Sequence, residues 1–222
     1  MSTTEHTPPK YDNGAMRASW PTVGAKRALW LSAGFGLVAD LLSKWWAFRA
    51  VAPDPVIVLR EDVLRVGPEH LYTLIPPHQP VTVWDGFLQF TLVLNPGAVF
   101  GLGAGRRWVF IVFTFGAIAF CLYLFKRWTT PKMKFAPLSI GLVLAGGLGN
   151  LYDRLLFGCV RDFIHPLPGR ILPWGVKWPN GSPEVWPYVS NVADLLLIIG
   201  IAVLGWYSFT EQPEQKSESA KK

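Results

Sequence analysis

Long apolar runs separated by polar loops dominate the chain. Four runs are long enough to form membrane spans, at about residues 28–48, 108–125, 135–151 and 189–209. A hydrocarbon core about 30 Å thick takes about 20 helical residues, and in lipid a helix satisfies its own backbone hydrogen bonds within one segment. The pattern therefore predicts an all-α polytopic membrane protein with four transmembrane helices.

The two loops predicted on the outer side differ in character. The first, about residues 49–107, contains two strand-like segments, 55–59 and 81–94, and an Asp-Gly turn inside the second segment is typical of a β-hairpin. The second loop, about residues 153–188, is dense in Pro, Gly and Trp. We expect a small β-rich extracytoplasmic subdomain from the first loop and an interfacial segment lying on the membrane from the second.

Composition supports a membrane protein and narrows the alternatives. Of the 222 residues, 50% are hydrophobic, only 16% are charged and 11 are Trp, a residue that favours membrane–water interfaces. This hydrophobicity excludes an intrinsically disordered chain, and the basic residues form no clustered polar surface that would bind nucleic acid. The two Cys residues do not make a disulfide framework, and the four His residues lack the spacing of a metal site.

The basic residues also predict the orientation in the membrane. The N-terminal arm (1–27), the loop 126–134 and the C-terminal tail (210–222) hold 11 Lys and Arg residues, whereas the two other loops, about twice as long in total, hold 9. Because basic segments stay on the cytoplasmic side, we expect both termini to be cytoplasmic. Residues 28–209 then form one four-helix membrane domain between two cytoplasmic tails.

Ionisable side chains gather near the predicted outer ends of the helices. Asp40 lies about eight residues, or ~12 Å, from the outer end of the first span, and Asp194 lies about five residues, or ~8 Å, below that of the fourth. Other polar residues lie near them or follow the third span: Lys44, Asn150, Asp153, Arg154, Asp162 and Asn191. A charge within a membrane costs roughly 2.5–3.5 kcal/mol, so this grouping indicates a functional site.

Simpler explanations exist for most of these residues. Asp40 and Lys44 have the i, i+4 spacing of a local ion pair, which favours a structural role. Asp153 and Arg154 are explained equally well as a pair that caps a helix end, and Asp162 in a polar loop as a solvated charge. The remaining aspartate, in the fourth span, has no basic neighbour within a turn, so it needs a partner from another part of the chain.

Five short strings, in this order, resemble those of the bacterial lipoprotein signal peptidases, the signal peptidase II family. They are residues 40–44 (DLLSK), 95–100 (NPGAVF), 147–154 (GLGNLYDR), 160–163 (VRDF) and 191–194 (NVAD). Each string alone is weak, but together they lie on the expected helix ends across all four spans. Two positions depart from the family pattern, because Leu41 stands where Gln is usual and Arg161 where an apolar residue is usual.

The resemblance implies an aspartic endopeptidase of the bacterial cytoplasmic (inner) membrane whose catalytic carboxyls are Asp162 and Asp194. It implies substrate binding or site ordering for five further residues and a structural role for three. The first group is Asn95, Gly97, Asn150, Arg154 and Asn191, and the second is Asp40, Lys44 and Asp153. It implies no metal or other cofactor.

The residue types suit this chemistry. Two carboxyls that share one proton can hydrolyse an amide, because the ionised one takes a proton from water while the protonated one polarises the scissile carbonyl. By resemblance, the substrate is a prolipoprotein whose Cys carries a diacylglyceryl group, and the cleaved bond lies just before that Cys. Membrane lipids are the other expected partners, and we expect a monomer that binds no nucleic acid.

Two functions of other classes remain open at this point. A proton- or ion-coupled transporter would use Asp40, Asp162 and Asp194 as a relay. It needs a polar path to the cytoplasmic side, and the inner halves of the four spans lack ionisable residues. A lipid-binding assembly factor would instead use the aromatic loops as a clamp.

Overall fold

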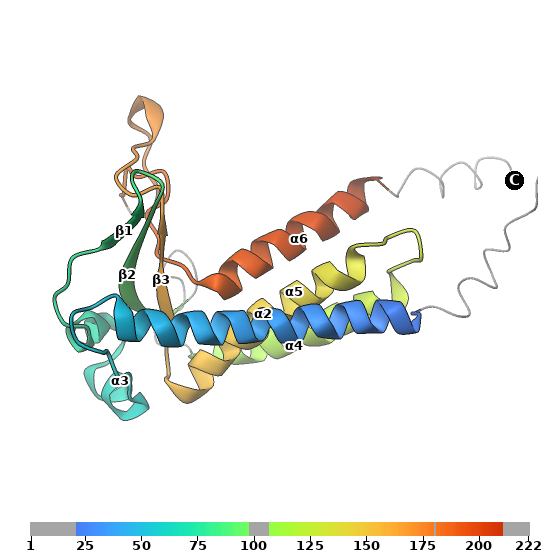
Figure 1. The fold of residues 1–222 in the computed structure, drawn as a ribbon, viewed down its shortest axis with the longest axis horizontal. Coiled ribbons are helices and arrows are strands. Elements are labelled where there is room, and N and C mark those ends of the chain that lie inside the picture. Colours follow the sequence, from blue (N-terminus) through green and yellow to red (C-terminus); the bar gives the residue numbers. More distant parts are fainter. Residues whose placement is uncertain (1–20, 98–106, 180, 211–222) are drawn as a thin grey trace, which may run out of the picture.

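Four long helices are the largest elements of the protein (Figure 1). The computed structural model describes residues 21–97, 107–179 and 181–210. The helices are α2 (Val23–Ala50), α4 (Arg107–Arg127), α5 (Ala136–Leu156) and α6 (Val192–Thr210). Each covers one of the four apolar runs, so the prediction of four long helices is confirmed, with ends that differ from the predicted ones by at most five residues.

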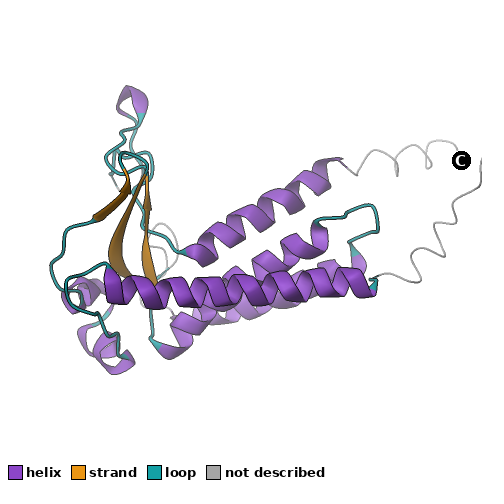
Figure 2. Ribbon diagram, viewed as in Figure 1, coloured by secondary structure: helices purple, strands orange, loops and turns teal. Residues whose placement is uncertain are grey.

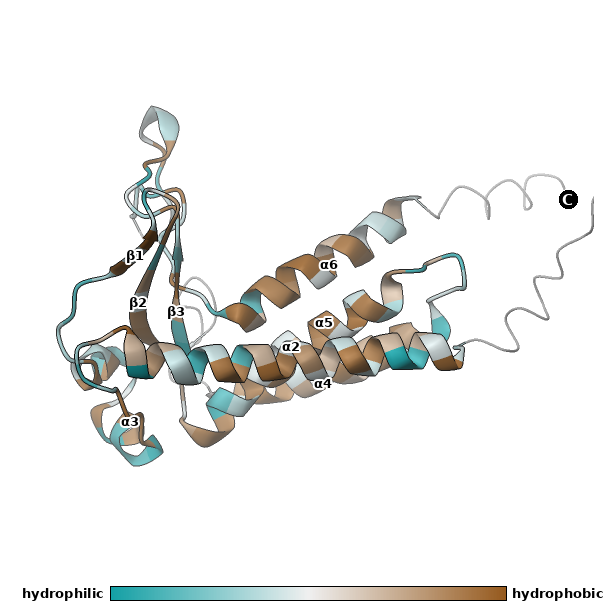
Figure 3. Ribbon diagram, in the orientation of Figure 1, coloured by the Kyte–Doolittle hydropathy of each residue, from teal (hydrophilic) through white to brown (hydrophobic). Residues whose placement is uncertain are grey.

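Two of the helices are long and apolar enough to cross a membrane by length and composition, over Trp108–Arg127 in α4 and Val192–Thr210 in α6. Figure 3 shows apolar residues along both. Large side chains on them face outward, since Phe120 is 59% and Phe209 is 87% exposed. The other two helices, α2 and α5, are less apolar because they carry the buried charges of the site described below.

Helix α5 is the central helix of the bundle and contacts α2, α4 and α6. Its glycines permit these contacts. A Cβ atom at Gly146 would collide with the backbone oxygen of Ala193 in α6, and one at Gly141 would collide with the backbone oxygen of Leu29 in α2. Small residues thus let the helix backbones approach closely, which brings the polar ends of α2, α5 and α6 together.

A three-stranded antiparallel sheet lies at one end of the helices (Figure 2). Its strands are β1 (Val81–Trp84), β2 (Leu88–Asn95) and β3 (Val160–Pro166), in that order. The predicted hairpin is confirmed, because Asp85 and Gly86 (φ +66°) form the turn between β1 and β2. Strand β3 was not expected, and it places residue 162 beside the central helix.

The strand predicted at residues 55–59 is wrong. This segment has no strand partner, and its Val56 N–H donates instead to the Phe48 oxygen at the end of α2, at 2.7 Å. Pro55 has no N–H to give to a ladder, which favours this irregular conformation. Two short helical elements follow, α3 (Arg60–Val66) and the 3-10 helix η1 (Pro68–Leu74).

The rest of the second outer loop forms an arm that extends sideways from the sheet (Figure 1). A bridge between Ile171 and Glu184 holds its two sides together, and the 3-10 helix η3 (Pro173–Gly175) lies beyond that bridge. Trp174 in η3 is 94% exposed and has a positive φ of 58°. Whether this arm lies on a membrane, as the composition predicts, stays a prediction.

Candidate active site

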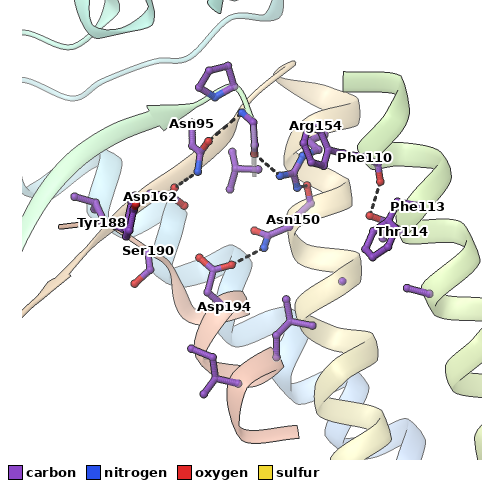
Figure 4. A pocket seen from close by; sticks show the side chains of 18 of the residues that line it. Asn95, Phe110, Phe113, Thr114, Asn150, Arg154, Asp162, Tyr188, Ser190 and Asp194 are labelled. Atoms are coloured by element: carbon purple, nitrogen blue, oxygen red, sulfur yellow. Dashed lines mark hydrogen bonds between the residues drawn. The ribbon is translucent and has the colours of Figure 1, made fainter. Parts of the chain in front are cut away.

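A cavity of about 810 Å³ lies between the sheet and the helices α4, α5 and α6. Two aspartates that are 32 residues apart in the sequence, Asp162 and Asp194, line it together. Figure 4 shows that one comes from β3 and the other from the first turn of α6, and that both face the same space. The two sequence strings that contain these aspartates therefore fold into different elements, and the two carboxyls meet at the cavity.

Asp162 is buried, with 1% of its surface exposed, so the interpretation as a solvated loop charge is wrong. Its two oxygens accept hydrogen bonds from neutral amides, from Asn95 Nδ2 at 3.0 Å and from Asn191 Nδ2 at 2.6 Å. Burial, with a smaller contribution from the neighbouring carboxyl of Asp194, raises the pKa of Asp162 to about 7, although the hydrogen bonds from the two amides lower it. A carboxyl in this setting can hold or release a proton near neutral pH.

Asp194 is positioned by the local chemistry of a helix start. The backbone N–H of Asp194 donates to Asn191 Oδ1 at 3.1 Å, and the backbone N–H of Asn191 donates to Asp194 Oδ2 at 3.2 Å. This reciprocal pair is a capping box, in which the residue before the helix and the third helical residue satisfy each other's free N–H groups. The remaining oxygen of Asp194 accepts from Asn150 Nδ2 at 2.9 Å. The partner that this aspartate needed is an amide from α5.

Asn150 and Asn191 join the two carboxyls. Asn191 Nδ2, which donates to Asp162, also donates to Asn150 Oδ1 at 3.1 Å, and Asn150 Nδ2 in turn reaches Asp194. The same Asn150 Oδ1 accepts from Lys44 Nζ at 3.1 Å. Because an ammonium group only donates, Lys44 fixes which end of the Asn150 amide faces the cavity carboxyl.

Arg154 ties the end of β2 to α5. Its Nη2 donates to the Gly97 oxygen at 2.8 Å, and its Nη1 donates to the Asn150 oxygen at 3.2 Å. The Gly97 N–H donates to Asn95 Oδ1 at 3.0 Å, which turns the chain after β2. Four of the five residues assigned to substrate binding or site ordering therefore line the cavity, and the fifth, Asn191, lies buried behind them in contact with Asp162 and Asn150. Residues 98–100, which complete the string that begins at Asn95, lie outside the described part of the chain.

The three residues assigned a structural role form a buried charge cluster with a fourth residue, Arg161. The predicted ion pair is confirmed, with Lys44 Nζ 2.8 Å from Asp40 Oδ2, and Lys44 also lies 3.5 Å from Asp153 Oδ2. Arg161 Nη2 lies 2.8 Å from Asp153 Oδ1. The alternative of an Asp153–Arg154 capping pair is wrong, because the two side chains point to different partners.

Sequence reasoning did not find the aromatic and apolar part of the cavity wall. Trp186 and Tyr188 line the cavity from the base of the arm, and Phe110 and Phe113 line it from α4. The i, i+3 spacing of the two Phe residues was a usable signal, but an apolar span carries many such pairs. Among the described residues, no three His, Cys, Asp or Glu side chains gather closely enough to hold a metal ion.

Comparisons with known proteins point to one family. The family model described as Peptidase_A8, Signal peptidase (SPase) II, matches residues 32–210. A lipoprotein signal peptidase of Moorella thermoacetica is 34% identical over 167 residues, which cover 74% of this chain and 99% of that protein. One of Desulfitobacterium hafniense is 34% identical over 143 residues, covering 63% of this chain and 82% of that protein.

The fold is also similar to that of a solved bacterial membrane enzyme. The TM-score is 0.58 at 22% sequence identity, and the match covers 86% of this chain and 96% of the other. The family match includes most of α2, all of α4, α5 and α6, and the three-stranded sheet. The chain therefore belongs to the signal peptidase II family of aspartic peptidases, as the five sequence strings implied.

Proposed function

We propose that Asp162 and Asp194 are the catalytic carboxyls with which this signal peptidase II removes signal peptides from prolipoproteins. One observation carries the proposal, the chain of hydrogen bonds that runs from one carboxyl through Asn191 and Asn150 to the other beside a single cavity. In the described part of the chain, neither carboxyl has a direct ion-pair partner that would hold it permanently ionised.

The pair carries out the reaction by sharing one proton. Two adjacent carboxyls in a buried site do not both ionise, and the pKa of Asp162, about 7, supports one shared proton near neutral pH. The ionised carboxyl takes a proton from the attacking water, and the protonated one donates a hydrogen bond to the scissile carbonyl. Either carboxyl can take either role, so we assign the acid and base roles to the pair.

The apolar part of the cavity supports a lipid-modified substrate. Beyond the two carboxyls, the lining continues along α4 through Ala117, Ile118 and Cys121 and along α6 through Leu197 and Ile198. Such a surface takes up hydrocarbon or an apolar peptide segment. The substrate is then a prolipoprotein whose Cys bears a diacylglyceryl group, with the scissile bond just before that Cys.

The four long helices span the bacterial cytoplasmic membrane, with residues 28–209 as one peptidase domain. The outward apolar faces of α4 and α6 support this placement, and the basic loop 126–134 supports cytoplasmic termini. The sheet and the exposed Trp174 then lie at the outer membrane surface, where Trp is favoured. Since one chain supplies both carboxyls and their amides, a monomer suffices for activity.

The test replaces each proposed catalytic carboxyl by an amide of the same shape. In purified full-length protein with a lipidated precursor in detergent, Asp162→Asn and Asp194→Asn should each lower turnover by at least about 10³-fold, since an amide cannot exchange the proton. Asp85→Asn in the exposed β1–β2 turn is the matched control and should cleave normally. Appreciable turnover by either single variant, with wild-type folding, removes that residue from the pair.

A further inference from the structure

Four buried charges of alternating sign lie side by side next to the cavity. Asp40 and Lys44 come from α2, Asp153 from the last turns of α5, and Arg161 from β3. The first three are fully buried and Arg161 is 8% exposed. Two acids and two bases sum to zero, so the loss of any single one of them leaves the cluster with a net charge.

Among the partners of Asp153, Arg161 makes the most contacts. Its Nη2 and Nε donate to Asp153 Oδ1 at 2.8 and 3.3 Å, and its backbone N–H donates to Asp153 Oδ2 at 3.0 Å. Its guanidinium also lies 4.2 Å from the ring centre of Phe157. Because side chains alternate along a strand, Arg161 points toward α5 while its neighbour Asp162 points into the cavity. The residue beside the proposed catalytic carboxyl thus fastens β3 to α5.

The cluster reaches the cavity through Lys44. Its ammonium contacts Asp40 at 2.8 Å, Asp153 at 3.5 Å and the Asn150 oxygen at 3.1 Å. Without the guanidinium of Arg161, two carboxylates would depend on this one ammonium. The bond that orients Asn150, and through it Asp194, would then compete with a second full ion pair.

We propose that Arg161 is a positioning residue of the peptidase reaction, which neutralises Asp153 so that Lys44 can hold Asn150 between the two cavity carboxyls. The proposal rests on the proposed function of Asp162 and Asp194.

The effect of removing Arg161 on the protonation of Asp162 depends on the other charged groups around that carboxyl. Asp194 faces it from α6, Arg154 from α5 and Lys44 from α2. The remaining members of the cluster, Asp40 and Asp153, lie behind Lys44. Loss of the positive charge of Arg161 leaves the surroundings more negative by one unit, which favours the protonated form of the carboxyl pair.

The experiment measures kcat and KM against pH for full-length protein in detergent with a lipidated precursor. Arg161→Gln keeps hydrogen-bond donors for Asp153 and removes the charge, whereas Arg161→Lys keeps the charge. We expect Arg161→Gln to lower kcat about tenfold with KM nearly unchanged. The acidic limb of the pH–kcat profile of Arg161→Gln should move to higher pH by roughly half to one unit. This is the size of shift expected from one uncompensated charge at an effective dielectric constant of about 20. Arg161→Lys should keep a kcat and an acidic limb close to those of the wild type.

The double variant Arg161→Gln with Asp153→Asn separates positioning from folding, because it makes the cluster neutral again. It should recover the wild-type pH profile, and Arg65→Gln at an exposed site is the control that should change nothing. An unshifted profile for Arg161→Gln, or a double variant as impaired as the single, overturns the proposal. If Arg161→Gln does not fold, the pH profile of the double variant still decides, because the proposal requires that profile to match the wild type. Asp162→Asn and Asp194→Asn are assayed in parallel. Turnover by either of them would show that the proposed function has failed, which is a different result from failure of the role proposed for Arg161.

Discussion

Four aspartates lie close together in this protein, and they form two sets that differ in the kind of group that contacts them. Asp162 and Asp194 face the cavity and accept hydrogen bonds from neutral amides. Asp40 in α2 and Asp153 in α5 do not line the cavity, and both are fully buried and pair with a Lys and an Arg. Three of the four aspartates are buried and Asp194 is half-buried, so buried aspartates occur in both sets and the partners make the difference.

The contrast explains how one set can do chemistry while the other holds the helices. A carboxylate in a buried ion pair is costly to separate from its partner, and losing the partner leaves an uncompensated charge. A carboxyl held by amides can exist in both protonation states, which the reaction requires. The two sets meet at Asn150, which accepts a hydrogen bond from Lys44 and donates one to Asp194.

The largest expected effect comes from breaking the ion-paired set. Lys44→Ala leaves the carboxylate of Asp40 buried without its partner, and we expect a loss of about 3–5 kcal/mol in stability. Adding Asp40→Asn should recover most of that loss, because Asp153 keeps Arg161 as its partner. The measurement is the Tm of both single variants and the double variant in detergent.

Activity of the same variants sharpens the comparison. The double variant still lacks the ammonium that orients Asn150. We therefore expect its kcat to remain about tenfold below wild type although its stability is restored. A Lys44→Ala protein that melts like wild type would show that Asp40 needs no cation, and the division between the two sets would fail.

The sequence predicted the ion-paired set only in part, and the reason is geometric. The spacing of Asp40 and Lys44 within one helix made their pair predictable. The contact of Asp153 with Arg161 depends on where α5 ends and on β3, which was not expected. Charged residues at 161 and 162 interrupt the apolar pattern of that strand, and its partner β2 lies far away in the sequence.

The cavity set was predictable by a different route. The short strings identified Asp162 and Asp194 by resemblance, but spacing alone gave no reason for them to meet. Their meeting depends on the β2–β3 register, which pairs Val93 with Asp162, and on the capping box at the start of α6. The four helices, in contrast, follow directly from the length of the apolar runs.

The second prediction removes the amide bridge and keeps the helix cap. Ser caps helices about as well as Asn, but Asn191→Ser is too short to reach both Asp162 and Asn150. We expect kcat to fall by about 10²-fold with a Tm close to wild type. Asn191→Ala, which loses the cap as well, should be less stable by about 1 kcal/mol. Normal turnover in Asn191→Ser would mean that the two carboxyls do not need the bridge.

The third prediction concerns the apolar part of the cavity. Gly147 lines it one turn from Asn150, and a Cβ there would meet only Thr114, at 3.7 Å. Gly147→Leu should therefore fold normally, occupy space needed by the substrate and raise KM about tenfold. Gly116→Leu on the exposed face of α4, where nothing lies within 4 Å, is the matched control. Equal KM values in the two variants would place the substrate's apolar part elsewhere.

The smallest expected effect concerns a nucleophile that neither set uses. Cys159 lies three residues before Asp162 and is 1% exposed, and burial raises the pKa of its thiol to about 12. Almost none is thiolate at neutral pH, so Cys159→Ala should keep kcat/KM within about twofold of wild type. Its loss of packing against Phe163 should cost about 1 kcal/mol of stability.

Thiol reagents are best tested in a Cys121→Ala background, because Cys121 lines the cavity and a bulky adduct there would block it. Loss of turnover in folded Cys159→Ala protein would point to a cysteine mechanism and remove the amide-held carboxyls from the chemistry.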